Sequence, residues 1–208
     1  MVAALYEGDW PTRVILLDGN TGTAKTEVLA LLADRGIQTI DLEGLAGHRG
    51  SVFGATGAQP DQKRFETELA SAMARLDPNR PLVVEAESSK IGARLIPPSL
   101  WAAMRGAPRL RIDAPVAARA AYLTHAYADI IADREALDAA ILSLKRLAGG
   151  ESVRRWQGLA REGAFETLAA ELIAKHYDPR YARGAARNDG AEAVFETDAL
   201  DADALERL

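Results

Sequence analysis

Eight consecutive residues, at positions 19–26, have the chemistry of a phosphate-binding loop. They read Gly-Asn-Thr-Gly-Thr-Ala-Lys-Thr and follow the apolar run 13–18. Such a loop turns its backbone N–H groups toward phosphate oxygens, and the N-terminus of the following helix favours the anion. Lys25 supplies a positive charge for the terminal phosphate, and Thr26 offers a hydroxyl to Mg²⁺. The expected ligand-binding residues are Gly19, Asn20, Thr21, Gly22, Thr23, Ala24, Lys25 and Thr26.

One position departs from the G-x-x-x-x-G-K-[ST] pattern that defines a P-loop, or Walker A motif. Ala24 stands where glycine is usual. Its methyl group is tolerated if the backbone there is helical, but it narrows the approach of a phosphate. An ordinary strand-to-helix turn with a surface lysine is the alternative interpretation.

Two carboxylates follow a second apolar run, 81–85. Glu85 ends the run and Glu87 lies two residues further on, so both face the same way if the strand continues. Each of the two glutamates is a candidate to bind a metal ion or to act as a base. Their spacing does not show which of the two residues matters more. We expect Thr26 and Glu85 as metal ligands and add Ser88 to the ligand-binding residues. The alternative is a pair of solvated carboxylates.

Further polar residues follow the short run 38–41. Asp41 and Glu43 lie where ligands bind at the carboxyl ends of strands in a doubly wound sheet. Five glycines between positions 44 and 57 predict an irregular loop rather than a helix. Within that loop, His48 and Arg49 are candidates for acid–base work or anion binding, although such a pair is often ordinary surface.

The elements that carry these residues alternate along the chain. Strands are expected at 13–18, 38–41, 81–85 and 109–113, and helices at 26–35 and 62–76. This alternation predicts an α/β fold, a P-loop NTPase-like, mostly parallel sheet flanked by helices. The alanine-rich stretch 116–175 predicts an α-helical module, split into about three helices by Gly149-Gly150 and the glycines at 158–163. We therefore divide the chain into a core (1–115), a helical module (116–187) and a returning edge strand with an acidic helix (188–208).

Composition excludes several classes of protein. The chain has 208 residues, a formal net charge of −5 and 48% apolar residues, enough for a full core. Cysteine is absent, which excludes disulfides, thiolate metal sites and a thiol nucleophile within this sequence. No apolar run reaches about 18 residues and the first residues lack a signal-peptide pattern, so we expect a cytoplasmic protein with no membrane partner.

Positive charge is concentrated locally despite the negative total. Between positions 90 and 119 there are six basic residues against one acid. Arg119, just after the run 109–113, either pairs with phosphate oxygens or forms a structural salt bridge. The pattern permits polyanion binding without requiring it.

Four motifs, in order, resemble the tRNA 2-selenouridine synthase family. After the loop at 19–26, Asp-Leu-Glu-Gly-Leu-Ala-Gly-His-Arg-Gly-Ser-Val-Phe-Gly at 41–54 resembles the family's D-L-E-G-L-A-x-H-R-G-S-x-F-G. Val-Glu-Ala-Glu-Ser-Ser-Lys-Ile-Gly at 84–92 is similar to V-E-x-E-S-[RK]-x-I-G, with a shifted basic position. Tyr-Asp-Pro-x-Tyr at 177–181 resembles Y-D-P-x-Y.

The resemblance implies a transferase that modifies the wobble uridine of certain tRNAs. In that family 2-thiouridine is converted to 2-selenouridine through an S-geranyl intermediate, with geranyl diphosphate and selenophosphate as donors. From the residues themselves, we expect Lys25, Glu85, Glu87, His48 and Arg49 to be catalytic. The resemblance also implies a cysteine-bearing rhodanese domain or subunit missing from this chain, so completed selenation by this chain alone is not expected.

The helical module is the expected tRNA-facing part. The basic residues of this module that we expect to face the tRNA are Lys145, Arg146, Arg154, Arg155 and Arg161. Trp156 and Tyr122 either stack on an unstacked base or pack in the core.

Two other functions fit part of the same pattern. A small-molecule P-loop kinase shares the loop, the acid after the third strand and a basic helical lid. A non-catalytic tRNA-binding subunit of a split enzyme would bind diphosphate and tRNA without turnover. The motif at 41–54 and the lack of an evident adenine-binding pattern favour the transferase over the kinase.

Overall fold

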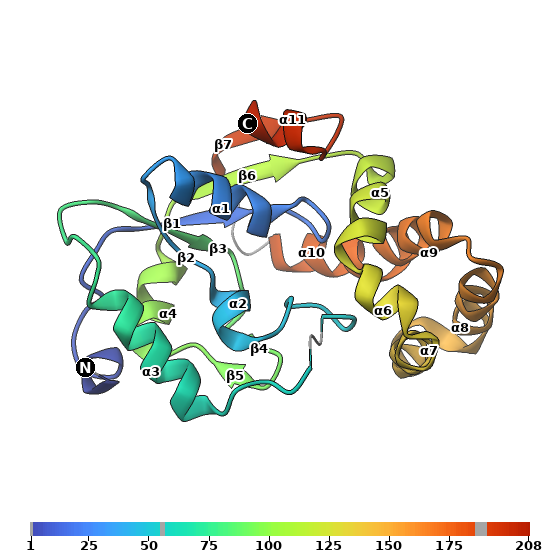
Figure 1. The fold of residues 1–208 in the computed structure, drawn as a ribbon, viewed down its shortest axis with the longest axis horizontal. Coiled ribbons are helices and arrows are strands. Elements are labelled where there is room, and N and C mark those ends of the chain that lie inside the picture. The colour runs from blue at the N-terminus through green and yellow to red at the C-terminus, as the bar shows by residue number, and fades with distance from the viewer. Residues whose placement is uncertain (1, 55–56, 186–190) are drawn as a thin grey trace. The chain divides into compact units, whose positions relative to one another are not determined.

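A five-stranded sheet organises the first part of the chain (Figure 1). The computed structural model describes residues 2–54, 57–185 and 191–208. Strand β1 pairs in parallel with β3 and β6, and β2 pairs in parallel with β3. The spatial order is β2-β3-β1-β6-β7, so β7 lies at an edge. The bounds are β1 Val14–Asp18, β2 Gln38–Ile40, β3 Leu82–Glu85, β6 Arg109–Asp113 and β7 Ala191–Glu196. The predicted mostly parallel α/β fold is confirmed.

Helices cover both faces of this sheet. Alternate residues of a strand point to opposite faces, and Leu16 and Val84 join the core with Phe65 of α3 and Leu100 of α4. Leu17 and Val83, buried on the other face, lie on the side of α1, which contacts β1 and β3. The bounds are η1 Val2–Leu5, α1 Lys25–Asp34, α3 Gln62–Met73, β4 Lys90–Ile91, β5 Arg94–Leu95 and α4 Pro98–Arg105.

The segment after β2 differs from the sequence-based expectation. A short helix, α2 (Leu42–Ala46), occupies the start of the predicted irregular loop. The Asp41 side chain accepts a hydrogen bond from the Gly44 N–H at 2.6 Å and so caps the N-terminus of the helix. Gly47 ends it in the left-handed conformation at φ 60°. The prediction of a loop was wrong here because the cap outweighs the low helix propensity of Gly44.

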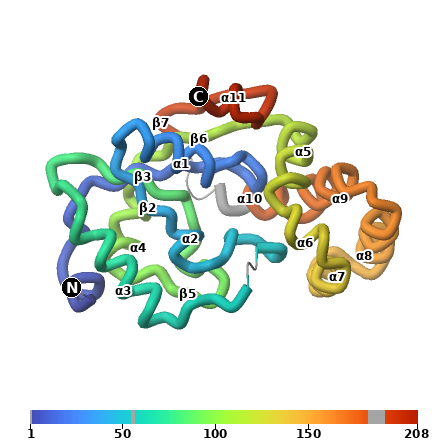
Figure 2. Tube along the Cα trace, in the orientation of Figure 1, coloured from blue at the N-terminus to red at the C-terminus, as the bar shows by residue number. Residues whose placement is uncertain are grey.

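The chain forms two compact units. Of the described residues, 2–19, 25–112 and 191–195 make up the sheet unit, and 20–24, 113–185 and 196–208 make up the helical unit. Figure 2 shows the Cα trace of the helical unit from α5 to α10. Its elements are α5 Val116–Ala126, α6 Ala128–Ala132, α7 Arg134–Ser143, α8 Lys145–Glu162, α9 Phe165–Leu172, a π-helical turn at Ile173–Tyr177, α10 Asp178–Ala185 and α11 Ala202–Glu206. The predicted boundary at 187/188 lies outside the described residues.

The helical unit has more helices than the glycines predict. Breaks occur at Tyr127, Asp133 and Leu144, none of which is glycine. Asp133 caps α7 through the Ala136 N–H at 3.0 Å, so a polar side chain rather than a flexible backbone starts that helix. The predicted break at Gly149-Gly150 is confirmed as well, because Gly149 has the non-helical angles φ 83° and ψ 160° within α8, and Gly163 ends that helix. Among the described residues, no helix has both the length and the apolar character needed to cross a bilayer.

Candidate functional site

The loop between β1 and α1 makes a tight turn. Both the N–H and the Oγ1 of Thr23 donate to the Asn20 carbonyl oxygen, at 3.3 and 2.9 Å. Gly22 adopts φ 85°, a conformation that favours glycine. A Cβ at this position would lie 3.0 Å from Leu123 Cγ and 3.1 Å from the Arg119 carbonyl oxygen. The turn therefore needs glycine at position 22 for both its backbone angle and its packing.

Ala24 holds a strained backbone conformation. Its φ is 56°, which makes it the one non-glycine residue of the described chain with a positive φ, and its side chain is buried. The left-handed region costs an alanine roughly 1–2 kcal/mol. The condition under which its methyl group is readily tolerated, a right-handed helical backbone, is thus not met in the structure. Such strain persists only where the surrounding contacts impose it, and it is typical of functional loops.

Lys25 is the first residue of α1 and turns back onto the loop. Its Nζ donates to the Gly19 carbonyl oxygen at 2.9 Å. The Gly19 N–H in turn donates to Asp18 Oδ1 at 2.8 Å, and Asp18 forms an ion pair with Arg109. Thr26 is exposed in the first turn of the same helix. An ammonium group and a helix N-terminus thus lie together at the start of the loop, as phosphate binding requires.

Two carboxylates from different elements form a pair near Lys25. Glu43 of α2 and Glu87, which follows β3, share a side-chain hydrogen bond. Burial, reinforced by the charge of Glu87, raises the pKa of Glu43 to about 8, and burial also raises the pKa of Glu87. The positive charge of Lys25 acts in the opposite direction on both groups. Two carboxyls that share a hydrogen bond favour a state in which one of them is protonated.

Gly50 makes room for this pair. Its φ is 65°, and a Cβ there would overlap Glu43 Oε1 and lie 3.2 Å from Glu87 Oε1. The backbone of the 41–54 motif thus packs directly against both carboxylates. Sequence reasoning assigned a role to each acid separately and missed both their pairing and Gly50.

Glu85 and Asp41 have a different setting from Glu87. The Glu85 side chain is fully buried, and its Oε2 accepts from the Leu42 N–H at 3.1 Å. Burial, followed by the charge of Asp41 and a hydrogen bond that the protonated Glu85 carboxyl donates to Asp41, raises the pKa of Glu85 well above its usual range. Strand β3 ends at Glu85, so the continued strand that would align Glu85 with Glu87 is not present. Glu85 and Asp41 together hold the start of α2.

The assignment of Thr26 and Glu85 as ligands of Mg²⁺ stays a prediction. Among the described residues, no group of three or more His, Cys, Asp or Glu side chains is arranged to hold a metal ion. Glu85 is enclosed and its carboxyl favours the neutral form, whereas a metal ligand must be ionised. Thr26 remains available as a hydroxyl donor at the surface. We derive no chemical step through a metal ion.

The remaining predicted residues of this unit make local contacts. His48 Nδ1 accepts from the Gly50 N–H at 3.1 Å, and partial burial lowers the pKa of the ring. The Arg49 N–H donates to the Gly54 carbonyl oxygen at 2.9 Å. Ser88 is exposed and its Oγ donates to the Lys90 carbonyl oxygen at 2.6 Å. His48 and Arg49 thereby shape the turn that brings Gly50 to the carboxylate pair.

Comparison with known proteins identifies the family of this chain. A family described as the tRNA 2-selenouridine synthase AAA domain matches residues 12–204. The chain belongs to this family. It is similar to tRNA 2-selenouridine synthase of Chromohalobacter salexigens, at 34% identity over 81% of this chain and 52% of that protein. It is also similar to the synthase of Hahella chejuensis, at 35% identity over 88% of this chain and 43% of that protein. The chain thus spans about half the length of these curated relatives.

Arg119 is buried within the helical unit. Its guanidinium forms a two-point ion pair with Asp178, with Nη2 to Oδ2 at 2.7 Å and Nη1 to Oδ1 at 2.9 Å. Nη1 also donates to the Thr21 carbonyl oxygen at 3.2 Å. Asn20 Nδ2 donates to the same carboxylate at 3.1 Å. Sequence reasoning missed Asp178, although the motif at 177–181 contains it.

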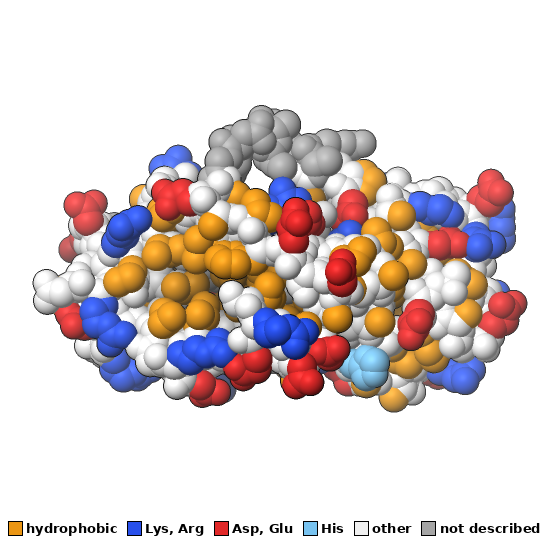
Figure 3. All heavy atoms as spheres, turned by 90° about the horizontal axis from the view of Figure 1, so that it is seen from above, with side chains coloured by type: hydrophobic (Ala, Val, Ile, Leu, Met, Phe, Trp, Pro, Cys, Tyr) orange, Lys and Arg blue, Asp and Glu red, His pale blue; other side chains and the backbone are white. Residues whose placement is uncertain are grey.

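The basic residues of α8 lie at the surface, whereas Trp156 of the same helix and Tyr122 of α5 do not. All five predicted basic residues are exposed: Lys145, Arg146, Arg154, Arg155 and Arg161. Arg155 Nε pairs with Glu171 Oε1 at 2.5 Å, and Trp156 Nε1 donates to Glu171 Oε2 at 3.2 Å. Trp156 is fully buried and therefore packs in the core. Tyr122 is half-buried. The face drawn in Figure 3 carries basic and acidic side chains interspersed.

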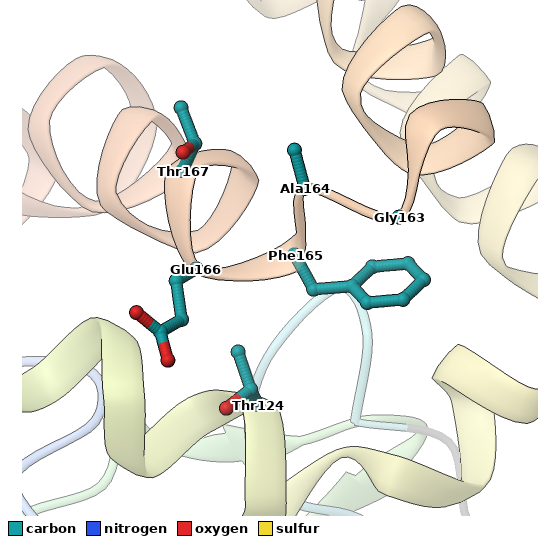
Figure 4. Close-up of a pocket in the computed structure, with 6 residues that line it drawn as sticks. All are labelled: Thr124, Gly163, Ala164, Phe165, Glu166 and Thr167. Carbon is teal, nitrogen blue, oxygen red and sulfur yellow. The ribbon is translucent and has the colours of Figure 1, made fainter.

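A cavity of about 330 Å³ lies elsewhere in the helical unit (Figure 4). Thr124 of α5 lines one side, and the junction of α8 and α9 lines the other. Its lining residues are Thr124, Gly163, Ala164, Phe165, Glu166 and Thr167. None of them is a predicted site residue, and the single titratable group is the exposed Glu166.

Proposed function

We propose that this domain is the diphosphate- and tRNA-binding part of a wobble-uridine modifying enzyme. In this proposal it geranylates 2-thiouridine, with geranyl diphosphate as donor, on the way to 2-selenouridine. The observation that carries the proposal is the position of Lys25, whose Nζ lies 2.9 Å from the Gly19 carbonyl oxygen at the start of the loop. Membership of the family supports the tRNA-modifying role.

The loop and Lys25 serve the leaving group. In the transfer, the sulfur of 2-thiouridine bonds to C1 of the geranyl group while the C1–O bond to the diphosphate breaks. The electron pair of that bond leaves with pyrophosphate, so negative charge develops on the bridging oxygen. Backbone N–H groups of the loop, the N-terminus of α1 and the Lys25 ammonium stabilise that charge. No hydrolysis of ATP is required.

Glu87 is the proposed base for the uridine. Alkylation of the sulfur makes the N3 proton of the ring acidic, and the neutral product forms when that proton is removed. The ionised member of the Glu43–Glu87 pair accepts it, and the hydrogen bond between the two carboxyls favours Glu87 as that member because it lowers the pKa of Glu87. We place Glu87 in contact with the reacting base and Glu43 behind it.

The proton held by Glu43 has an electrostatic consequence for diphosphate binding. If both carboxyls were ionised, two negative charges would outweigh the single charge of Lys25 and repel an incoming anion. With Glu43 protonated, the charges of Glu87 and Lys25 balance. The pKa of about 8 for Glu43 therefore places the site in its anion-accepting state at neutral pH.

The exposed basic residues of α8 are the proposed tRNA contact. Arg154 and Arg161 are exposed, whereas the Arg155 guanidinium is bonded to Glu171. Phosphate contacts from such side chains position a nucleic acid without reading its sequence. We therefore propose a local contact through the exposed basic side chains of α8.

The selenium step needs residues outside this sequence. Selenophosphate is the proposed selenium donor, and the chain contains no cysteine to carry sulfur or selenium. We assign that step to a rhodanese domain or subunit acting with this domain. Mg²⁺, if used with the diphosphate, would draw on the Thr26 hydroxyl and substrate oxygens. The proposed location is the cytoplasm.

One reaction tests the proposal. Purified protein is mixed with 2-thiouridine tRNA and geranyl diphosphate, and the nucleosides are analysed by mass spectrometry together with released pyrophosphate. S-geranyl-2-thiouridine and pyrophosphate in equal amounts are expected, with loss of both in Lys25→Ala and retention in the exposed control Lys63→Ala. Binding of both ligands without turnover would instead indicate a non-catalytic subunit. ATP-dependent phosphorylation of a small molecule would indicate a kinase.

A further inference from the structure

The guanidinium of Arg119 donates its hydrogen bonds to oxygen atoms of the protein itself. Its side chain is 4% exposed, and Nε donates to the Ala114 carbonyl oxygen at 3.1 Å. Nη1 donates to the carbonyl oxygen of Thr21 and to Asp178, and Nη2 donates to Asp178. A guanidinium carries five N–H donors, and these bonds engage four of them. Arg119 is therefore built into the protein through the loop backbone and through Asp178.

Asp178, much later in the sequence, accepts hydrogen bonds from both Arg119 and Asn20 and so links them in one network. It is the first residue of α10, directly after the π-helical turn Ile173–Tyr177. One oxygen of its carboxylate accepts from both Arg119 and Asn20, and the other accepts from Arg119. Two of the loop's residues, Asn20 and Thr21, are thus bonded to this network, one through its side chain and one through its backbone carbonyl.

A second contact holds the neighbouring part of the loop. At Gly22 the backbone approaches α5 so closely that a Cβ would lie 3.1 Å from the Arg119 carbonyl oxygen. Two residues further on, Ala24 keeps its left-handed backbone. A strained residue is retained only where its surroundings leave the chain no alternative. The bonds to Asn20 and Thr21 and the packing at Gly22 provide that constraint.

We propose that Asp178 is a positioning residue for the phosphate loop, acting through Arg119 and Asn20 to hold residues 20–24 in the anion-binding conformation. Arg119 is then a brace for the loop backbone and not a ligand of the phosphate. This inference rests on the proposed function only in that the loop is taken to bind a diphosphate. It gives the 177–181 motif a structural role, because Asp178 of that motif holds the backbone conformation of residues 20–24.

Asp178→Asn tests the brace, since it removes the charge and keeps the size of the side chain. Hydrogen exchange of the backbone amides in residues 20–25 is measured without ligand, and pyrophosphate affinity is measured by calorimetry. We expect faster exchange confined to the loop and pyrophosphate binding weaker by about tenfold or more. Glu151→Gln, at an exposed acid on α8, is the matched control and should change neither.

Three outcomes would overturn the proposal. Unchanged exchange in the loop would show that Asp178 does not constrain it. Faster exchange across α7 to α9 as well would show a general structural role. Tighter pyrophosphate binding would show that Asp178 competes with the anion for Arg119.

A milder variant and a wild-type measurement complete the test. If Asp178→Asn does not fold, Asn20→Ala removes only the loop side of the network, and the same local increase in exchange is expected from it. Unchanged exchange in that variant would overturn the brace. Wild-type protein that fails to bind pyrophosphate would refute the proposed function, while loop-confined exchange in Asp178→Asn would still support the brace.

Discussion

Glu43 and Glu87 hydrogen-bond to one another against the backbone of Gly50. The two acids come from separate motifs, one after β2 and one after β3, and meet at the carboxyl edge of the sheet near Lys25. In the proposed function, the protonation state of this pair sets the charge that an incoming diphosphate meets. This relationship connects the 41–54 motif to the phosphate loop through electrostatics.

The first prediction concerns pH. The pKa of Glu43 is raised from 4.5 to about 8 in the folded protein, so the folded state holds more protons than the unfolded state between these values. The free energy of unfolding therefore falls as pH rises from about 4.5 to about 8. Glu43→Gln should flatten this decline, as measured by thermal melts across that range. The exposed control Glu7→Gln should follow the wild-type curve, and identical curves for all three proteins would contradict the assignment.

A steric prediction follows from Gly50. Gly50→Ala adds a Cβ that overlaps Glu43 Oε1, whereas Gly36→Ala adds one in open space at a similar φ of 78°. Both substitutions incur left-handed strain of roughly 1–2 kcal/mol. Gly50→Ala should lose about 1–3 kcal/mol more through overpacking and should also reduce turnover. Urea unfolding measures the difference, and equal losses would show that Gly50 does not pack on the carboxylate pair.

Relief of strain at Ala24 gives a prediction of opposite sign. Ala24→Gly should raise the free energy of unfolding by about 1 kcal/mol, because glycine adopts φ 56° without steric cost. The control Ala30→Gly, at an exposed position in the middle of α1, should lower it by about 1 kcal/mol. Chemical denaturation of both variants checks the signs. Destabilisation by both would mean that Ala24 is not strained in solution.

The basic face of α8 is tested by salt dependence. The double variant R154Q/R161Q should bind tRNA more weakly, and the slope of log affinity against log salt should shrink by about 0.7–0.9 for each phosphate that the variant no longer neutralises. The matched variant R64Q/R75Q removes the same charge from the sheet unit. Filter binding at several salt concentrations distinguishes the two. Equal losses in both variants would mean that net charge, rather than this helix, sets the affinity.

Local patterns in the sequence predict much of the fold. The apolar runs give β1, β3 and β6 to within a residue, and the spacing of Phe65 and Leu69 gives α3. These features depend on neighbours along the chain, which a sequence displays directly. The helix α2 was missed because a single side chain, Asp41, caps it among glycines. The breaks at Tyr127 and Leu144 carry no turn residue at all.

The sequence analysis named individual candidate residues but did not predict which of them contact one another in the fold. Lys25 and the loop follow from one motif, but the partners of Glu43 and Arg119 lie far along the chain. The sequence alone does not distinguish a solvated carboxylate from one that accepts a hydrogen bond from a backbone N–H. It also does not show that a carboxyl is protonated beside another acid. Only the fold shows that Glu85 is enclosed, that Glu87 is paired and that Asp178 meets Arg119.

The central claim is that the loop at 19–26, with Lys25, binds a diphosphate. Titration calorimetry of pyrophosphate into wild-type protein, Lys25→Ala and the exposed control Lys63→Ala tests it most directly. We predict a single site whose affinity falls by roughly 10- to 100-fold in Lys25→Ala, as expected for the loss of a charge-assisted hydrogen bond, and is unchanged in Lys63→Ala. Equal affinity of all three proteins for pyrophosphate would contradict the account.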